Sequence, residues 1–254
     1  MDTLSVVTIT LNEAHRLREC FESIDWADEW VVVDSGSSDG TAELAQRLSA
    51  RVFRRPFDNF SNQWNFAAGR ARSDWVLVLA ADERITPGLR SEIEAVLQGG
   101  DGPSCYAMPR RNVLFGRWMR YGGQYPDWSL RLFRRGTARW VGDIHERLAH
   151  AGRLGRLRQP ILHLSFSTLG EWIKKMDRQT DQEAFFAAQR GERASWTDVA
   201  LRPAYWFLRM YVARRGFLDR WEGFVHSLCT FTCVFFRYAK LRELGARGEG
   251  GSKP

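Results

Sequence analysis

Short apolar segments alternate with helical segments over the first part of the chain, and this pattern constrains the fold more than any other feature. The expected strands are 4–9, 30–33, 51–53 and 75–79, and the expected helices are 14–24, 41–48, 62–70 and 87–97. Strands separated by helices of this length indicate a mostly parallel sheet with helices on both faces. We therefore expect an α/β fold.

The pattern changes in the second half of the chain. Residues 105–165 contain short strands rich in aromatic and arginine side chains, and the chain becomes helical after about residue 166. We expect an α/β domain over 1–165 and a helical region over 166–254, with a frayed polar tail over 245–254. A chain of 254 residues is long enough for one large domain with a helical appendage.

The composition is basic and compatible with a folded core. There are 37 Lys and Arg against 30 Asp and Glu, a net charge of +7, and 44% of the residues are apolar. A basic balance suits nucleic acid, an anionic membrane surface or phosphorylated substrates. The chain shows no known nucleic-acid motif, so we expect no nucleic-acid partner.

The cysteines and the amino-terminal segment bear on location. Cys20, Cys105, Cys229 and Cys233 have no metal-ligand spacing, and we expect the last two, one helical turn apart, to be reduced. Residues 4–9 are apolar but lack a basic start and a cleavage site, so we expect no secretory signal. Both observations favour a cytoplasmic, reducing location.

Three polar turns follow three of the expected strands. They are Thr10–Glu13, Asp34–Gly40 and Ala80–Glu83. Ligands of parallel α/β sheets bind beyond the carboxyl ends of the strands. The three turns are therefore predicted to converge on one crevice.

The turn over Asp34–Gly40 follows a strand and opens a helix. Its glycines allow a tight backbone, and free amides at a helix start attract anions. Asp34, at the strand tip, could accept hydrogen bonds from a base or a ribose. The alternative is an ordinary Ser/Asp helix cap.

The strand over Trp75–Leu79 leads into the acidic pair Asp82-Glu83. An acidic turn at the carboxyl end of a buried parallel strand is typical of a metal site. The alternative is that the pair caps the helix that begins near Pro87.

Four segments together resemble a known family. In order and spacing, Val6–Glu13, Ala27–Thr41, Gln63–Ala67 and Asp74–Glu83 resemble the motifs of inverting family 2 glycosyltransferases, whose GT-A fold is Rossmann-like. Two later segments narrow the resemblance. Tyr125–Arg135 and Val141–Leu148 are similar to the bacterial subgroup of β-1,4-glucosyltransferases that add glucose to the inner-core heptose of lipopolysaccharide.

The resemblance implies a set of donor-binding residues and a metal. The residues that would bind the UDP-sugar are Thr10, Asn12, Glu13, Asp34, Ser35, Gln63, Asn65, Ala81 and Asp82. Asp82 matches the last acid of the family's Asp-x-Asp turn, which holds Mg²⁺ or Mn²⁺ at the diphosphate, whereas Ala80 replaces the first acid. Many relatives have two aspartates where this chain has Asp34-Ser35.

His163 is the second expected metal ligand. Enzymes with this fold often use a late histidine, and His163 lies in the strand-like segment 160–165. The alternative is a purely structural histidine.

An inverting transfer needs a base that takes the proton of the acceptor hydroxyl. Asp127 and Glu146 are the candidates. We favour Asp127, because aromatic residues that suit a sugar ring surround it in the sequence. The alternatives are a structural ion pair of Asp127 with Arg131, and a salt bridge of Glu146 with a neighbouring arginine.

The stretch from Pro203 to Leu244 is dense in aromatic residues with arginines interspersed. Its longest charge-free run, Gly223–Phe236, has fourteen residues and is too short to span a bilayer. Such helices suit a membrane interface with anionic lipids. The alternative is an amphipathic pair packed on the catalytic domain.

These observations predict an enzyme rather than a basic membrane or nucleic-acid module. We expect a metal-dependent transfer of glucose from UDP-glucose to a lipid-anchored lipopolysaccharide core, at the inner face of the bacterial inner membrane. The alternatives are a polyprenyl-phosphate or another glycan as acceptor, and a sugar-nucleotide-binding protein inactivated at Ala80.

Overall fold

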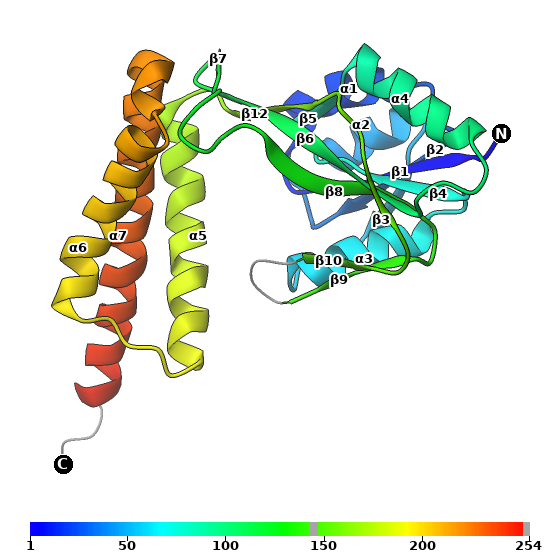
Figure 1. Ribbon diagram of the computed structural model, residues 1–254. Coiled ribbons are helices and arrows are strands. Elements are labelled where there is room, and N and C mark those ends of the chain that lie inside the picture. Colours follow the sequence, from blue (N-terminus) through cyan, green and yellow to red (C-terminus); the bar gives the residue numbers. More distant parts are fainter. Residues whose placement is uncertain (143–146, 251–254) are drawn as a thin grey trace. The chain divides into compact units, whose positions relative to one another are not determined.

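A computed structural model describes residues 1–142 and 147–250, with only the backbone for 247–250 (Figure 1). The chain forms two compact units. The first consists of Met1–Arg111 and Asp127–His163, and the second of Asn112–Pro126 and Leu164–Pro254. The segment 112–126 thus groups with the C-terminal helices, and a domain boundary at residue 165 stays a prediction.

The first unit begins with alternating strands and helices. These elements are β1 (Leu4–Thr10), α1 (Ala14–Glu22), β2 (Glu29–Asp34), α2 (Thr41–Arg47), β3 (Arg51–Arg54), α3 (Phe60–Arg70), β4 (Trp75–Val78), β5 (Glu83–Ile85) and α4 (Pro87–Gln98). Strands then dominate the chain. They are β6 (Cys105–Leu114), β7 (Arg117–Trp118), β8 (Asp127–Arg134), β9 (Ala138–Val141), β10 (Arg147–His150), β11 (Leu154–Arg156) and β12 (Ile161–Phe166).

The main sheet has the strand order β3-β2-β1-β4-β8-β6-β12-β5. The first four strands are parallel, and β8 joins β4 in the antiparallel direction. Two strands next to each other, β1 and β2, end together because Thr10 lies opposite Asp34. The register therefore brings the first two polar turns to the same edge of the sheet.

Helices cover both faces of the parallel strands because successive side chains of a strand point to opposite faces. Val6 and Leu77 pack in one core with residues of α1, α2 and α4, while Val7 and Val76 pack in a second core with residues of α3. Each fully buried aliphatic side chain contributes about 1.5–3 kcal/mol. The expected α/β class with helices on both faces is confirmed.

Side-chain caps fix where two of these helices begin. The Asn59 side chain accepts a hydrogen bond from the Asn62 amide before α3, and the Thr86 side chain accepts one from the Leu89 amide before α4. Pro87 then occupies the first turn of α4, where its missing N–H has no cost. Thr86 is the cap of α4, so the alternative that Asp82-Glu83 caps this helix is wrong.

The second unit is mainly helical, as expected for the C-terminal region. Its helices are α5 (Leu169–Gln189), α6 (Trp196–Leu208), the π-helical turn η1 (Arg209–Ala213), the 3₁₀ turn η2 (Gly216–Asp219) and α7 (Arg220–Gly250). Helix α7 packs against α5 and α6. The described backbone of α7 extends into the 245–254 tail, and fraying of that tail stays a prediction.

Two sequence expectations meet the structure in this unit. None of the helices in the described ranges is long and apolar enough to cross a membrane. Cys229 and Cys233 are free thiols one turn apart in α7, and burial raises the pKa of each to about 12. The expectation that both are reduced agrees with the structure.

Candidate functional site

The turns after β1 and β2 are joined by hydrogen bonds. The Asn12 amide donates to Ser37 Oγ at 2.8 Å, and Asn12 Oδ1 accepts from the Ser38 amide at 2.9 Å. The Glu13 amide donates to Thr41 Oγ1 at 2.9 Å. Asn12 has a φ of 58°, in the left-handed region that asparagine tolerates better than most residues. The two predicted turns thus form one polar surface at the carboxyl end of the parallel strands.

Asp34 holds this surface together. Its Oδ1 accepts hydrogen bonds from the amides of Gly36 and Ser37, both at 3.0 Å. Its Oδ2 accepts from Thr10 Oγ1 at 3.2 Å and from the Ser37 hydroxyl. Asp34 is only 1% exposed, so a base or ribose could reach its carboxylate only by displacing one of these donors.

Gln63 and Asn65 project from α3 in different directions. The fully buried Gln63 donates from Nε2 to Ser35 Oγ at 3.0 Å, so it lies against the second turn. Asn65 instead exchanges two hydrogen bonds of 2.9 Å with the backbone of Trp140, which join α3 to β9. Gln63 therefore adjoins the expected donor site, while the amide of Asn65 is engaged in the fold.

Asp82 and His163 lie together at the third turn. Asp82 Oδ2 is 3.4 Å from His163 Nε2 and 3.8 Å from Arg16 Nη1, and Arg16 Nη1 is 3.9 Å from Glu13 Oε2. The antiparallel register places Glu83 opposite His163, which explains how a residue so late in the chain arrives here. The structure thus brings two predicted metal ligands to the predicted crevice. Arg16 was missed, although its position three residues after Glu13 on a helix was a usable signal.

Glu83 has a different environment from Asp82. It is fully buried, its Oε1 accepts from Arg131 Nη2 at 2.8 Å, and Arg110 Nη1 lies 3.7 Å away. Its Oε2 accepts from the Ala80 amide at 2.9 Å. Glu83 therefore fixes the shape of the turn from inside, and Asp82 is the acid that remains partly accessible.

Arg84 lies beneath the same turn. This buried side chain donates to the carbonyl oxygens of Ala81 at 2.7 Å and Arg16 at 2.9 Å. Ala81 is 3% exposed and packs in the apolar core. Any contribution of Ala81 to a donor site must therefore come from its backbone.

Asp127, the favoured base, is the first residue of β8. Its Oδ2 accepts from Arg110 Nε at 2.9 Å, because the register of β6 and β8 places these two residues opposite each other. The alternative pairing with Arg131 is wrong, since Arg131 pairs with Glu83. About a third of the Asp127 side chain remains exposed, at 32%. Glu146, the other candidate base, lies outside the described residues.

The side chains at the third turn supply part of the ligand set of a divalent-cation site. Asp82 and His163 offer one carboxylate oxygen and one imidazole nitrogen, which suit Mn²⁺, and Mg²⁺ also accepts carboxylate oxygens. No group of three or more His, Cys, Asp and Glu suited to a metal occurs in the described ranges. A cation held here would take its remaining ligands from phosphate oxygens and water.

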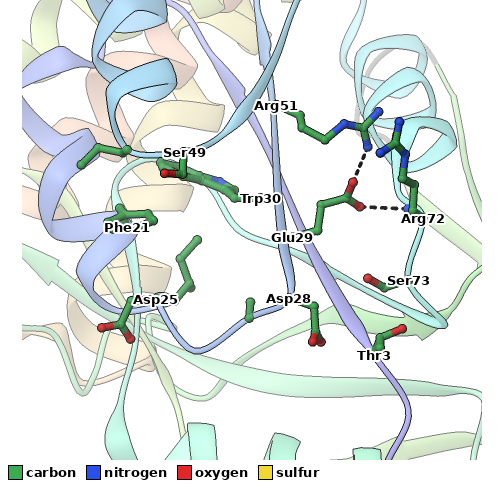
Figure 2. A pocket seen from close by; sticks show the side chains of 13 residues that line it. Thr3, Phe21, Asp25, Asp28, Glu29, Trp30, Ser49, Arg51, Arg72 and Ser73 are labelled. Atoms are coloured by element: carbon green, nitrogen blue, oxygen red, sulfur yellow. Dashed lines mark hydrogen bonds and ion pairs between the residues drawn. The ribbon is translucent and has the colours of Figure 1, made fainter.

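A pocket of about 570 Å³ opens elsewhere, at the amino ends of the parallel strands (Figure 2). Glu29, in its wall, is hydrogen-bonded by Ser5 Oγ and the Arg72 amide and pairs with Arg51. Burial alone would raise the pKa of Glu29, but these hydrogen bonds outweigh it and lower that pKa. The carboxylate is thus committed to the fold, and the pocket is at the wrong end of the strands for the predicted crevice.

Sequence comparison identifies related proteins. Residues 5–157 match the model of glycosyl transferase family 2. The lipopolysaccharide core biosynthesis glycosyltransferase LpsC of Rhizobium meliloti (strain 1021) is 29% identical over 251 residues, which cover 93% of this chain and 93% of the relative. An uncharacterized glycosyltransferase of Rickettsia felis (strain ATCC VR-1525 / URRWXCal2) is 26% identical and covers 96% of this chain and 90% of its own.

A solved structure has a similar fold. It is the mannosyltransferase PcManGT of Pyrobaculum calidifontis in complex with GDP-Man and Mn²⁺, with a TM-score of 0.54, 16% identity, and coverage of 94% of this chain and 87% of that one. This likeness supports the GT-A fold expected from the sequence. Because the family model spans more than half of the residues, this chain belongs to glycosyl transferase family 2.

Proposed function

We propose that this chain is a metal-dependent inverting glycosyltransferase that transfers glucose from UDP-glucose to a heptose of the lipopolysaccharide inner core. The observation that carries the proposal is the Asp82–His163 pair, 3.4 Å apart at the carboxyl end of the parallel strands. The Rhizobium relative, which spans nearly all of this chain, supports the choice of acceptor.

The metal would bind at Asp82 and His163. When bound, Mg²⁺ or Mn²⁺ stabilises the negative charge that builds on a departing nucleoside diphosphate. The archaeal neighbour was solved with Mn²⁺ and a nucleotide-sugar, which supports this assignment. Arg16 lies 3.8 Å from Asp82, and its guanidinium would suit hydrogen bonds to diphosphate oxygens of the donor.

The joined turns would hold the nucleoside part of the donor. Asn12 and Ser35 lie on the surface that Asp34 organises, and Gln63 contacts Ser35 from behind. Asp34 is the most buried acid of this surface, so we assign it the role of supporting the loop. We assign any contact with the ribose to the groups around it.

Asp127 would act as the base. It would accept the proton of the acceptor hydroxyl while that oxygen attacks the anomeric carbon. In the structure Arg110 holds Asp127 and also lies 3.7 Å from Glu83. This link would position Asp127 relative to the turn that carries Asp82.

A second candidate function follows from Ala80. Without the first acid of the turn, the chain could bind a sugar nucleotide and fail to transfer the sugar. The Ala80→Asp variant separates the two. A large gain of transfer by this variant would favour the inactive binder, and equal rates would favour the enzyme.

The acceptor class implies a location. A lipid-anchored core, or a polyprenyl-phosphate in its place, would be reached from the inner face of the bacterial inner membrane. Exposed aromatic and aliphatic side chains on the C-terminal helices, such as Trp196 at 70% and Leu201 at 65%, support peripheral association.

The direct test is UDP release from UDP-glucose with a purified heptose-terminated core acceptor, with and without Mn²⁺. We expect release that requires acceptor and metal, and loss of that release in Asp82→Asn. Asp25→Asn is the matched control, because Asp25 is an exposed acid in the pocket at the amino ends of the strands. Equal losses in the two variants, or release without metal, would contradict the proposal.

A further inference from the structure

The segment Arg209–Trp221, here called the tip, runs from the end of α6 through η1 and η2 to the first two residues of α7 (Figure 1). We propose that the tip docks on the surface of an anionic phospholipid bilayer. This proposal names the surface responsible for the peripheral membrane association proposed above. It rests on the proposed function, because a lipid-anchored acceptor is the reason for the chain to bind a membrane. Its test needs neither donor nor acceptor, so docking and transfer can fail separately.

The tip exposes apolar side chains that a folded protein ordinarily buries. Val212 is 55% exposed, Phe217 47%, Leu218 44% and Trp221 68%. Water contact with apolar side chains is unfavourable, so four large exposed apolar side chains within ten residues indicate an interaction site.

The patch continues along α6. Leu201, Tyr205 and Leu208 are 65%, 58% and 56% exposed, and with Val212 they follow the three- and four-residue spacing of one helix face. This face of α6 is therefore an apolar stripe that ends at the tip.

The charges of the tip have one sign on the outside. Arg214, Arg215 and Arg220 are exposed. Asp219, the only acid between 209 and 221, is 2% exposed and accepts hydrogen bonds from the amides of Arg120 at 3.2 Å and Tyr121 at 2.8 Å. An apolar surface with cations and no outward acid is complementary to a bilayer that contains anionic lipids.

Two of these arginines occupy unfavourable backbone conformations. Arg215 has a φ of 57° and Arg220 a φ of 58°, the left-handed region that favours glycine. Within the described residues, neither guanidinium forms an ion pair with an acidic side chain. The fold does not require an arginine at a strained position, so these side chains are consistent with a role in binding.

The 112–126 segment holds the tip in place. The Gly122 amide donates to the Arg214 carbonyl at 2.9 Å, in addition to the two amides bound by Asp219. Gln124 Nε2 contacts His226 Nε2, in the second turn of α7, at 2.9 Å. Tyr121, 38% exposed, adds an aromatic side chain of the kind enriched at membrane interfaces. The tip is thus a preformed surface.

A bilayer fits this surface better than other occupants. A second copy of the chain would bring like charges together around a symmetric contact. Nucleic acid would engage the arginines but leave the exposed Val212 and Leu218 without a use. Trp221 and the arginines match the aromatic and cationic groups that favour the interface with anionic lipids.

The test is co-sedimentation of the full chain with vesicles of phosphatidylcholine alone or mixed with phosphatidylglycerol. The double variant Arg215→Gly with Arg220→Gly removes two charges and relieves both strained φ angles, so it should fold at least as well as the wild type. We expect its affinity for the mixed vesicles to fall about thirtyfold, because each arginine lost near an anionic surface lowers the affinity about fivefold. Added salt should remove most of this difference.

The matched control is Arg178→Gln with Arg190→Gln, which removes two exposed charges outside the tip, one within α5 and one at its C-cap. It should retain its affinity. Leu218→Ser with Trp221→Ser should weaken binding at both low and high salt, because salt does not screen apolar contacts. Equal binding by the tip and control variants, a tip-dependent dimer without vesicles, or tip-dependent binding of single-stranded DNA in place of vesicles would overturn the proposal.

Discussion

Replacement of Glu83 by glutamine should destabilise the first unit without abolishing donor binding. Arg131 lies 2.8 Å from the Glu83 carboxylate and is 13% exposed, so it cannot recover its hydration when the charge is removed. Arg110 lies 3.7 Å from Glu83, is 27% exposed and keeps Asp127 as its partner. It therefore adds little to the loss of stability. One buried cation is left uncompensated, which costs about 3 kcal/mol, the low end for breaking a buried pair.

The assay is thermal and urea unfolding of wild type and Glu83→Gln. For a chain of this size a loss of about 3 kcal/mol lowers the midpoint by about 6–12 °C. The amide oxygen of the new glutamine can still accept from the Ala80 amide, so we expect the turn to keep its shape and the proposed binding of UDP to persist below the transition. Glu43→Gln is the control, because Glu43 and Arg54 form an exposed pair at 3.0 Å, worth less than about 1 kcal/mol. Equal losses in the two variants would refute the reasoning.

Three further predictions concern pH and packing. The pKa of Glu29 is lowered from 4.5 in the folded state, so Glu29→Gln should lower the free energy of unfolding above pH 4.5. In urea titrations this difference from the wild type should shrink as the pH falls through the folded-state pKa. Burial lowers the pKa of His226 from 6.5 to about 4, so the wild type should lose up to about 3 kcal/mol as pH falls from 6.5 to 4, and His226→Gln should lack this loss. Asn65→Ala should cost about 1–3 kcal/mol in urea unfolding, because two buried backbone groups of Trp140 lose their partners; an unchanged midpoint would contradict this.

The alternating elements of the first unit could be predicted because their signals are local. The strand 30–33 is an unbroken apolar run, and the structure buries Trp30 and Val31–Val33 between two layers of helices. Prolines and caps then mark where helices begin, as Thr86 and Pro87 do for α4. Boundaries differed from expectation by one or two residues; at α3, for example, the Asn59 cap starts the helix two residues before the expected position.

The partners within the site could not be predicted, because they depend on strand register. Asp82 and Glu83 are neighbours in the sequence, yet the strand β5 directs Glu83 into the protein toward Arg131. Asp127 pairs with Arg110 because β6 and β8 align these residues, and the sequence gives no sign of that alignment. The segment 112–126 groups with the C-terminal helices, where Asp219, far along the chain, accepts hydrogen bonds from the Arg120 and Tyr121 amides.

The central claim is that Asp82 and His163 hold a divalent cation against the diphosphate of a UDP-sugar. Titration calorimetry of UDP with the metal-free chain, with and without added Mn²⁺, tests it most directly. We predict that Mn²⁺ raises the affinity of the wild type for UDP about tenfold or more, and that Asp82→Asn loses this gain while retaining its fold. An affinity for UDP that is the same with Mn²⁺ and with a chelator, in a wild type that binds UDP, would contradict the account.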